Sequence, residues 1–366
     1  MRTPRIFIAA TRQDEGKTTT SLGLLTCLQQ RFNALGFMKP VGQRYVELPG
    51  GAQVDKDVWL FINHFGFTDP PEQMSPITVP PAFTRRYIEH RSPETLVAKV
   101  STAFDAVARG KEFVVLEGTG HAGVGAVFDL SNARVAEVLE SPVVLVSSGG
   151  IGKPVDEILL NCALFQRHNV PVAGVIINKT LPEKIEEIRH YVARVLAWHG
   201  LDLLGVLPYA PILSQPTLRE VCKEVDGRFI SGESLTANLI DESILVSHFS
   251  SELARGVKPK TLLIVTGDQS DVLVACASDD EGAQHLKINI GGILLVEGVE
   301  PKSHITKMLQ RANIPVLLTD MEAFPATSCV SALVAKIQPD NPEKVALIKE
   351  LFAAHVDVAR LVEKAG

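Results

Sequence analysis

The sequence lacks a tract of basic residues, a closely spaced pair of cysteines and an apolar run long enough to cross a bilayer. With a net charge of −6, it has no electrostatic footprint for nucleic acid or for an anionic membrane surface. Its five cysteines are scattered and odd in number, which is typical of buried, reduced thiols, and a zinc site is not expected without a Cys/His cluster. Charges such as Arg2, Arg5 and Arg12 near the N-terminus exclude a signal peptide. We therefore expect a cytoplasmic protein that binds small molecules or other proteins.

The 366 residues, of which 46% are hydrophobic, are enough for two domains. Apolar runs alternate with helical patterns, and this alternation predicts βαβ units and a parallel sheet with helices on both faces, the α/β class. We expect a first domain at 1–210, a linker and helical segment at 211–260, and a smaller α/β domain at 261–366. The expected strands are 6–8, 39–41, 113–116, 142–147, 171–177 and 202–207 in the first domain, and 261–265, 292–296 and 316–318 in the second.

Helical patterns follow most of these strands. A helix after residue 16 is expected to end at Gly36, and residues 44–92 are expected to be irregular apart from one helix that begins near Asp57. The other expected helices cover 92–109, 131–140, 154–168, 183–198 and a last one from Pro342 to the C-terminus.

Residues 9–20 follow the apolar run at 6–8 and precede a helical pattern, which is the order of a phosphate-binding loop (P-loop). Gly16 lets the backbone approach a phosphate, and the amides after it begin a helix, whose N-terminus favours anions. Lys17 would reach the β- and γ-phosphates, Thr18 would contact Mg²⁺, and Thr19 would contact the α-phosphate. The loop itself contributes Gln13, Asp14 and Glu15. Thr11 replaces the first glycine of the motif, and the alternative interpretation is a strand-to-helix turn with a surface lysine.

Other polar residues stand where strands end. Lys39 belongs to the short strand at 39–41 and would emerge on the loop's side of the sheet, although a solvated strand-end lysine is equally compatible with the sequence. Asp55 and Asp57 begin a helix, where either could serve only as an N-cap. Glu117 ends the strand at 113–116, the place from which a carboxylate holds Mg²⁺ in P-loop proteins.

The carboxyl ends of parallel strands meet at one edge of a sheet, and ligands bind there. This rule places the P-loop, Lys39, Glu117, Asn178 and Pro208 along the same edge. The sequence thus predicts one composite nucleotide site, with ATP and Mg²⁺ as its cofactors.

These residues support a resemblance. Residues 5 to about 210 resemble dethiobiotin synthetase and the N-terminal ATP-binding region of long bacterial phosphate acetyltransferases. The motifs that carry it are Thr11 to Thr18, Lys39-Pro40-Val41, the acidic pair Asp55 and Asp57, Glu117-Gly118-Thr119-Gly120, and Asn178. Residues 261 to about 352 resemble the DRTGG domain that follows this region in the acetyltransferases. The fold class implied is a P-loop NTPase-type sheet followed by a DRTGG-like α/β domain.

The resemblance also implies roles. Lys17 and Thr18 would bind phosphate and Mg²⁺, and Glu117 with either Asp55 or Asp57 would complete the metal site. Asn178 would read the adenine with the loop at Pro208 beside it. Lys39 would face the substrate that receives the phosphate, so that Lys17 and Lys39 are the candidate catalytic residues.

The second domain departs from its family pattern. The family's Gly-Asp-Arg segment is Gly267-Asp268-Gln269 here, and its Thr-Gly-Gly is Val296-Glu297-Gly298. Because an arginine is lost and Glu297 would repel a phosphate, we do not expect the family's anion role in this domain. We also expect no acetyltransferase domain, since these 366 residues stop where it would begin.

Two functions are compatible with these residues. The first, which the second domain favours, is an ATP-binding regulator or adaptor with weak ATPase activity that acts on a protein partner. We expect the chain to form a homodimer or a higher homo-oligomer. The alternative is an ATP-dependent ligase of the dethiobiotin synthetase type, in which a small carboxylate or carbamate attacks the γ-phosphate. A third hypothesis, a dimeric switch ATPase of the deviant Walker A kind, depends on Arg12, and an arginine on a loop is more often solvated.

Overall fold

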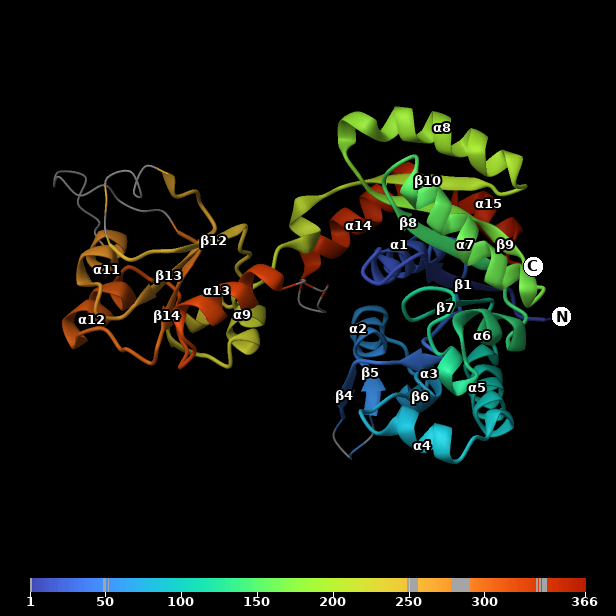
Figure 1. The fold of residues 1–366 in the computed structure, drawn as a ribbon, viewed down its shortest axis with the longest axis horizontal. Coiled ribbons are helices and arrows are strands. Elements are labelled where there is room, and N and C mark those ends of the chain that lie inside the picture. Colours follow the sequence, from blue (N-terminus) through green and yellow to red (C-terminus); the bar gives the residue numbers. More distant parts are fainter. Residues whose placement is uncertain are drawn as a thin grey trace. The chain divides into compact units, whose positions relative to one another are not determined.

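The computed structural model describes residues 2–48, 51, 53–248, 250, 256–277, 290–333, 335, 337 and 341–366. They form two compact units (Figure 1). The first unit combines residues 1–209 with residues 337–366, and the second consists of residues 210–336. The chain thus leaves the first unit once and later returns to it.

The first unit is built on a six-stranded parallel sheet with the order β10-β9-β8-β1-β7-β2. Its central strands are buried on both faces, which explains why they read in the sequence as continuous apolar runs. The strands are β1 (Arg5–Ala10), β2 (Leu35–Met38), β7 (Phe113–Glu117), β8 (Val143–Ser148), β9 (Val172–Thr180) and β10 (Leu203–Pro208).

Amphipathic helices cover this sheet. In α8 (Ile185–Trp198), for example, Ile188, Val192 and Leu196 recur at a spacing of four residues and are all buried. The remaining helices of eight or more residues before residue 210 are α1 (Lys17–Leu28), α2 (Lys56–Phe65), α5 (Pro93–Ala108) and α7 (Lys153–Arg167), joined by the shorter α3 (Pro71–Met74), α4 (Phe83–Glu89) and α6 (Asn132–Val138).

The structure differs from the expected elements between residues 29 and 92. Helix α1 ends at Leu28, and Gly36 lies inside β2, where a Cβ atom would be 3.1 Å from Val114. The expected strand at 39–41 is wrong, because Pro40 has no N–H and the N–H of Lys39 donates instead to Met74 O at 2.8 Å. The stretch 44–92, expected to be irregular, also contains short strands: β4 (Tyr45–Glu47) pairs with β5 (Gln53–Asp55), and β6 (Ile77–Thr78) pairs with β3 (Val41–Gly42), which lies just before the stretch.

The C-terminal residues belong to the first unit. Helix α14 (Pro342–His355) packs against α1 and β10, and α15 (Val358–Glu363) packs against β10 (Figure 1). The expected single helix is broken where Val356 pairs with Gly205 of β10. The expected domain at 261–366 is therefore too long, because its last thirty residues pack with the first unit.

The second unit has a five-stranded sheet with the order β11-β15-β14-β13-β12, in which only β11 is antiparallel to its neighbour. Its strands are β11 (Arg228–Ser231), β12 (Glu242–Leu245), β13 (Thr261–Thr266), β14 (Gly292–Val296) and β15 (Val316–Leu318). The expected linker at 211–260 is not a linker in this structure, since α9 (Leu218–Glu224), β11 and β12 belong to this unit. Residues 249 and 251–255 of that stretch lie outside the described residues.

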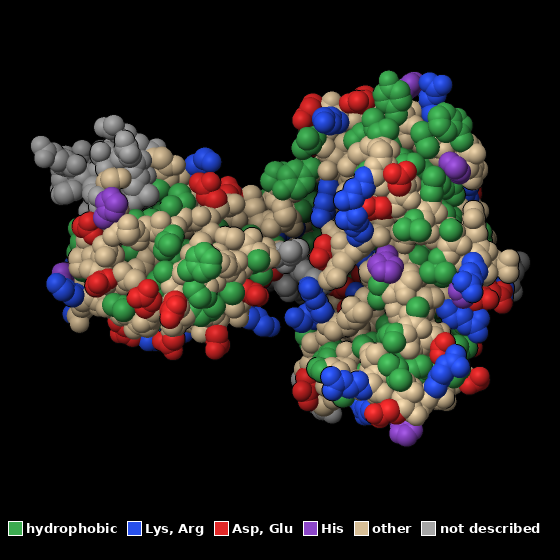
Figure 2. Space-filling view, in the orientation of Figure 1, with side chains coloured by type: hydrophobic (Ala, Val, Ile, Leu, Met, Phe, Trp, Pro, Cys, Tyr) green, Lys and Arg blue, Asp and Glu red, His purple; other side chains and the backbone are tan. Residues whose placement is uncertain are grey.

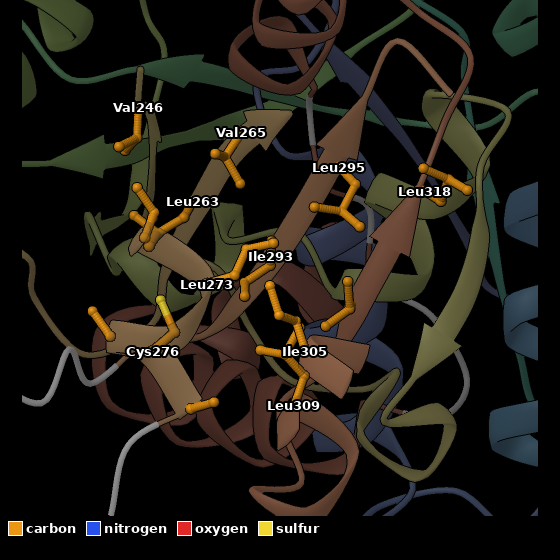
Figure 3. Packing of buried hydrophobic residues seen from close by; sticks show 14 residues of the cluster. Val246, Leu263, Val265, Leu273, Cys276, Ile293, Leu295, Ile305, Leu309 and Leu318 are labelled. Atoms are coloured by element: carbon orange, nitrogen blue, oxygen red, sulfur yellow. The ribbon is translucent and has the colours of Figure 1, made fainter. Parts of the chain in front are cut away.

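The core of the second unit forms where two helices pack on one face of its sheet. Leu273 and Cys276 of α11 (Ser270–Ala277) and Ile305 and Leu309 of α12 (Ser303–Arg311) lie beside the side chains of β13 to β15 (Figure 3). Helix α13 (Ala323–Ala332) and α9 contribute to the core on the other face. This unit therefore has its own hydrophobic core.

Among the described residues, no helix is both long and apolar enough to cross a membrane. On the face shown in Figure 2, Lys and Arg side chains are interspersed with Asp and Glu.

Candidate nucleotide site

The loop between β1 and α1 has the backbone of a phosphate cradle. Gly16 is the N-cap of α1 and lies in the left-handed region at φ 99°, which favours glycine. No side chain caps this helix, and its first turn has no acidic residue. A helix thus begins directly after Gly16, as the sequence predicted, and its N-terminal amides are oriented to receive an anion.

Contacts from two neighbouring strands hold the loop. Thr11, which replaces the first glycine, donates its N–H to Val146 O at 2.9 Å and its hydroxyl to Ser147 Oγ at 3.1 Å. Lys179 Nζ donates to Asp14 O at 2.6 Å. The side chains of Gln13 and Asp14 are exposed at the tip of the loop, whereas Glu15 is buried.

Lys17 folds back over this loop. Its ammonium lies 3.5 Å from Arg12 O, and the residue is 9% exposed. Burial lowers the pKa of Lys17, while the charge of Glu117 opposes that shift. A phosphate would replace this single weak contact with charge-assisted hydrogen bonds.

Three of the predicted acids meet around Lys39. Its ammonium forms ion pairs with Asp57, with Asp55 at 3.2 Å and with Glu117 at 3.4 Å. Asp55 also caps α2 by accepting the N–H of Asp57 at 2.9 Å. The interpretation of Lys39 as a solvated lysine is therefore wrong, since it is 6% exposed and enclosed by carboxylates.

The electrostatics of this cluster follow from burial and charge. Burial disfavours the ammonium of Lys39, but Asp57, Glu117 and Asp55 outweigh it and hold the pKa of Lys39 well above its usual value. Burial raises the pKa of Glu117 and of Asp55, and the charge of Lys39 opposes both shifts. The three acids and Lys39 carry a formal charge of −2 when all are ionised, so the cluster would attract a further cation.

The cluster reaches the P-loop through Thr18. Its hydroxyl donates to Glu117 Oε1 at 3.0 Å, and Oε2 of Glu117 is buried without a hydrogen-bond partner among the described residues. No group of three Asp, Glu, His or Cys side chains in the described ranges has the geometry of a metal cage. Mg²⁺ usually takes one or two carboxylates together with phosphates and water, and Thr18 with Glu117 fits that requirement.

Asn178, which was expected to read the adenine, contacts the backbone of the P-loop. Its Nδ2 donates to Glu15 O at 2.9 Å and its Oδ1 accepts the N–H of Lys179 at 2.9 Å, so Asn178 holds the loop backbone. Pro208 ends β10 and pairs with Thr180, two residues beyond Asn178 on β9. The hydroxyl of Thr180 is buried without a partner among the described residues. These side chains form the wall of the site on the side of β9 and β10.

Sequence reasoning missed two asparagines that organise the site. Asn161 of α7 accepts the N–H of Ala122 at 2.9 Å and donates to Thr11 O at 3.4 Å, so it joins the P-loop to the loop after β7. Asn132 donates to the carbonyls of Thr119 and His121. Asn161 follows Ile158 by three residues on a buried helix face, and a polar residue at such a position was the available signal.

Comparison with protein families agrees with this geometry. A family model described as "AAA domain" matches residues 4–217, and a model described as "DRTGG domain" matches residues 220–333. The predicted fold class, a P-loop type α/β sheet followed by a DRTGG-like α/β region, is confirmed, as is the resemblance from which it was drawn.

Curated proteins similar to this chain include phosphate acetyltransferases. Those of Nitratidesulfovibrio vulgaris and Pseudomonas putida are each 25% identical to it, over 97% and 98% of this chain and over 51% and 52% of their own lengths. The chain therefore spans about half the length of the curated relatives it matches.

Among solved structures, a putative plasmid partition protein of Borrelia burgdorferi bound to AMPPNP is 13% identical, with a TM-score of 0.39 over 57% of this chain and 88% of its own. The CBS and DRTGG domains of a Clostridium perfringens pyrophosphatase, complexed with diadenosine tetraphosphate, are 14% identical, with a TM-score of 0.27 over 47% of this chain and 84% of their own. Both overlaps are partial, as these TM-scores indicate.

Proposed function

The chain belongs to the AAA domain family that its residues 4–217 match, and from that premise we propose that it is an ATP- and Mg²⁺-binding regulator or adaptor with weak ATPase activity. The observation that carries this proposal is the meeting of the uncapped α1 N-terminus, Lys17 and the Thr18–Glu117 pair at one place. Nucleotide occupancy would change how the chain meets a protein partner.

Different residues of the site would contact the phosphates and the base of the nucleotide. The amides from Gly16 to Thr19 and the ammonium of Lys17 would bind the phosphates, and Asn178, Thr180 and Pro208 would lie on the side of the base. When bound, Mg²⁺ would screen the charge of the phosphates.

Thr18 and Glu117 would hold the metal together with Asp57. We choose Asp57 over Asp55 because Asp57 contributes to the field at Lys17, whereas Asp55 is engaged in capping α2. A carboxylate that holds Mg²⁺ beside the phosphates should be close enough to Lys17 to affect its pKa, and Asp57 meets this condition.

The state of Lys39 favours a regulator over a ligase. An ammonium has three N–H donors, and three carboxylates surround that of Lys39. To receive a substrate carboxylate, Lys39 would have to give up one of these ion pairs in a buried place, which is costly. The ligase alternative therefore requires a rearrangement that the regulator does not.

Thermal unfolding with and without Mg-ATP tests the nucleotide site. At about 100 times the Kd, a ligand that binds only the native state stabilises it by about 2.7 kcal/mol, or roughly 5 °C or more in melting temperature for a unit of this size. Lys17→Ala should lose most of that shift, and Thr18→Ala should lose the part that depends on Mg²⁺. Lys99→Ala, which changes an exposed lysine of α5, is the matched control and should keep the whole shift. Equal shifts in wild type and Lys17→Ala would refute the nucleotide site.

ATP turnover separates the two functions. The regulator should hydrolyse ATP slowly and ignore small carboxylates, whereas a ligase should respond to one of them. Our proposal includes a homodimer, which the resemblance supports, and a cytoplasmic location. Light scattering with and without Mg-ATP tests the homodimer. A turnover increase of tenfold or more with a small carboxylate and bicarbonate would replace the regulator with the ligase.

A further inference from the structure

A cavity lies in the first unit at the amino end of β1, whereas the P-loop follows the carboxyl end of the same strand. Its volume is about 400 Å³. The residues that matter for its chemistry are Arg2, Arg5, Phe104, Asp105, Arg109 and Glu140. The nucleotide site uses none of them.

Arg5 carries a buried charge without an acid to balance it. The residue is 8% exposed, its Nε donates to Thr3 O at 3.0 Å, and its Nη1 donates to Leu139 O at 3.0 Å. Its guanidinium lies 4.7 Å from the centre of the Phe104 ring. Among the described residues it forms no ion pair. Burying a guanidinium without an anion is costly, and proteins usually avoid it.

The surroundings of Arg5 increase this imbalance. Burial lowers the pKa of Arg5 and the charge of Arg2 lowers it further, while the charge of Asp105 opposes these effects. Glu140 forms an ion pair with Arg2, and Arg109 on the cavity wall has no ion pair within the described ranges. The carboxylates on the cavity wall therefore leave Arg5 and Arg109 without a close anionic partner.

A second cavity of the same unit provides a contrast. It has a volume of about 560 Å³ and contains Asp129, Arg134 and His168. Asp129 forms an ion pair with Arg91, and both Arg134 and His168 contact Glu137. The charges of Asp129, Arg134 and His168 are already paired, whereas Arg5 and Arg109 in the first cavity have no ion pair among the described residues.

We propose that the cavity at Arg5 binds a small organic anion. Its phosphate or carboxylate group accepts hydrogen bonds from the guanidinium groups of Arg5 and Arg109, which match the planar arrangement of such oxygens. Its apolar part packs on Phe104 and the neighbouring side chains of Val138 and Leu139, which also line the cavity. The volume is within the range of small-molecule sites.

Calorimetric titration of the full chain with phenyl phosphate and, separately, with benzoate tests this site. The two probes share a ring and differ in the anionic group, so they distinguish a phosphate ligand from a carboxylate ligand. We expect at least one to bind with a stoichiometry of one. Arg109→Gln should weaken that binding about tenfold, the effect of losing one charge-assisted hydrogen bond. Arg5→Lys, which keeps the charge and loses the planar group, should weaken it by at least as much.

Two controls keep the result specific. Arg31→Gln removes an exposed arginine elsewhere in the unit and should leave the affinity unchanged. Lys17→Ala should also leave it unchanged, so this site can fail or succeed independently of the nucleotide site. Arg109 is exposed, so Arg109→Gln remains informative if Arg5→Lys unfolds the protein. The site is refuted if neither probe binds, if Arg109→Gln binds like wild type, or if Lys17→Ala abolishes binding.

Discussion

The backbone at Gly16 is set by two independent constraints. Its φ of 99° is unfavourable for any residue with a Cβ atom, and a Cβ built there would overlap the side chain of Asn178. The same asparagine holds the loop through Glu15 O. The glycine and the asparagine therefore fix the loop as a pair.

Gly16→Ala should destabilise the first unit by roughly 1–3 kcal/mol, because it adds backbone strain and displaces Asn178. Urea unfolding measures the change. Lys99→Ala, an exposed change on α5, is the control and should stay within about 0.5 kcal/mol of wild type. If both variants lost the same stability, the contact between Gly16 and Asn178 would have no energetic role.

Glu15 makes stability depend on pH. Burial raises its pKa, and Lys179 opposes that shift. The folded state therefore holds the proton at pH values where the unfolded state has released it, so the free energy of unfolding falls as the pH rises through the raised pKa. Glu15→Gln should be more stable than wild type at pH 7, and this advantage should vanish below the usual pKa of a glutamate. Unfolding curves from pH 4 to pH 8 would show a constant difference if the charge of Glu15 were irrelevant.

At the scale of residues, the sequence predicted which side chains would meet but not how they pair. Thr18, Lys39, Asp55, Asp57 and Glu117 do converge, because strand ends of a parallel sheet share an edge. That Lys39 would be enclosed by the acids could not be read from the chain. The enclosure depends on β5 and α2, which bring Asp55 and Asp57 back over the sheet, and the path of such a connection has no periodic signal.

At the scale of elements, α1 and α14 show how closely the C-terminal helix fits. A Cβ at Gly23 of α1 would lie 2.6 Å from the ring of Phe352, which is 1% exposed. Glycine at position 23 thus lets α14 approach the helix that carries Lys17 and Thr18. The residues are more than three hundred positions apart in the sequence.

Phe352→Ala should cost roughly 3–5 kcal/mol of stability, the usual loss for a fully buried phenylalanine. Glu350→Ala, an exposed change on the same helix, should stay within about 0.5 kcal/mol of wild type. Denaturant unfolding followed at the first unit measures both. A small effect of Phe352→Ala would mean that α14 does not contribute to this core.

Elements with strong periodicity were predicted well, and those set by distant contacts were not. The strands β7, β8, β9 and β10 and the helices α5, α7 and α8 lie within a few residues of their expected ranges. The break at Val356 was not predicted, because it arises from pairing with Gly205 and from Asp357 N donating to Leu204 O at 2.8 Å. No local pattern announces such a contact.

At the scale of the whole molecule, the second unit is an insertion between β10 and α14 of the first. Contacts such as that between Gly23 and Phe352 define the first unit, and sequence order hides them. The expected boundaries followed the order of patterns along the chain, which is why residues 337–366 were assigned to the second domain.

Because the second unit is an insertion, two shortened chains should differ in the cooperativity of their thermal unfolding. Residues 1–209 joined to 337–366 by a flexible glycine–serine linker should unfold in one cooperative transition, whereas residues 1–209 alone should not, because the surface that α14 covers would be exposed. Circular dichroism during thermal unfolding compares the two chains. If residues 1–209 alone unfolded with equal cooperativity and midpoint, α14 and α15 would be dispensable to the first unit.

The returning C-terminal helices also have a consequence for biosynthesis. A ribosome releases residues 210–336 before it releases α14, so the second unit can fold while the first unit is still missing a helix. The surface of α1 that Phe352 covers stays open to solvent and to chaperones throughout that interval. The first unit thus begins before the second unit and is completed after it.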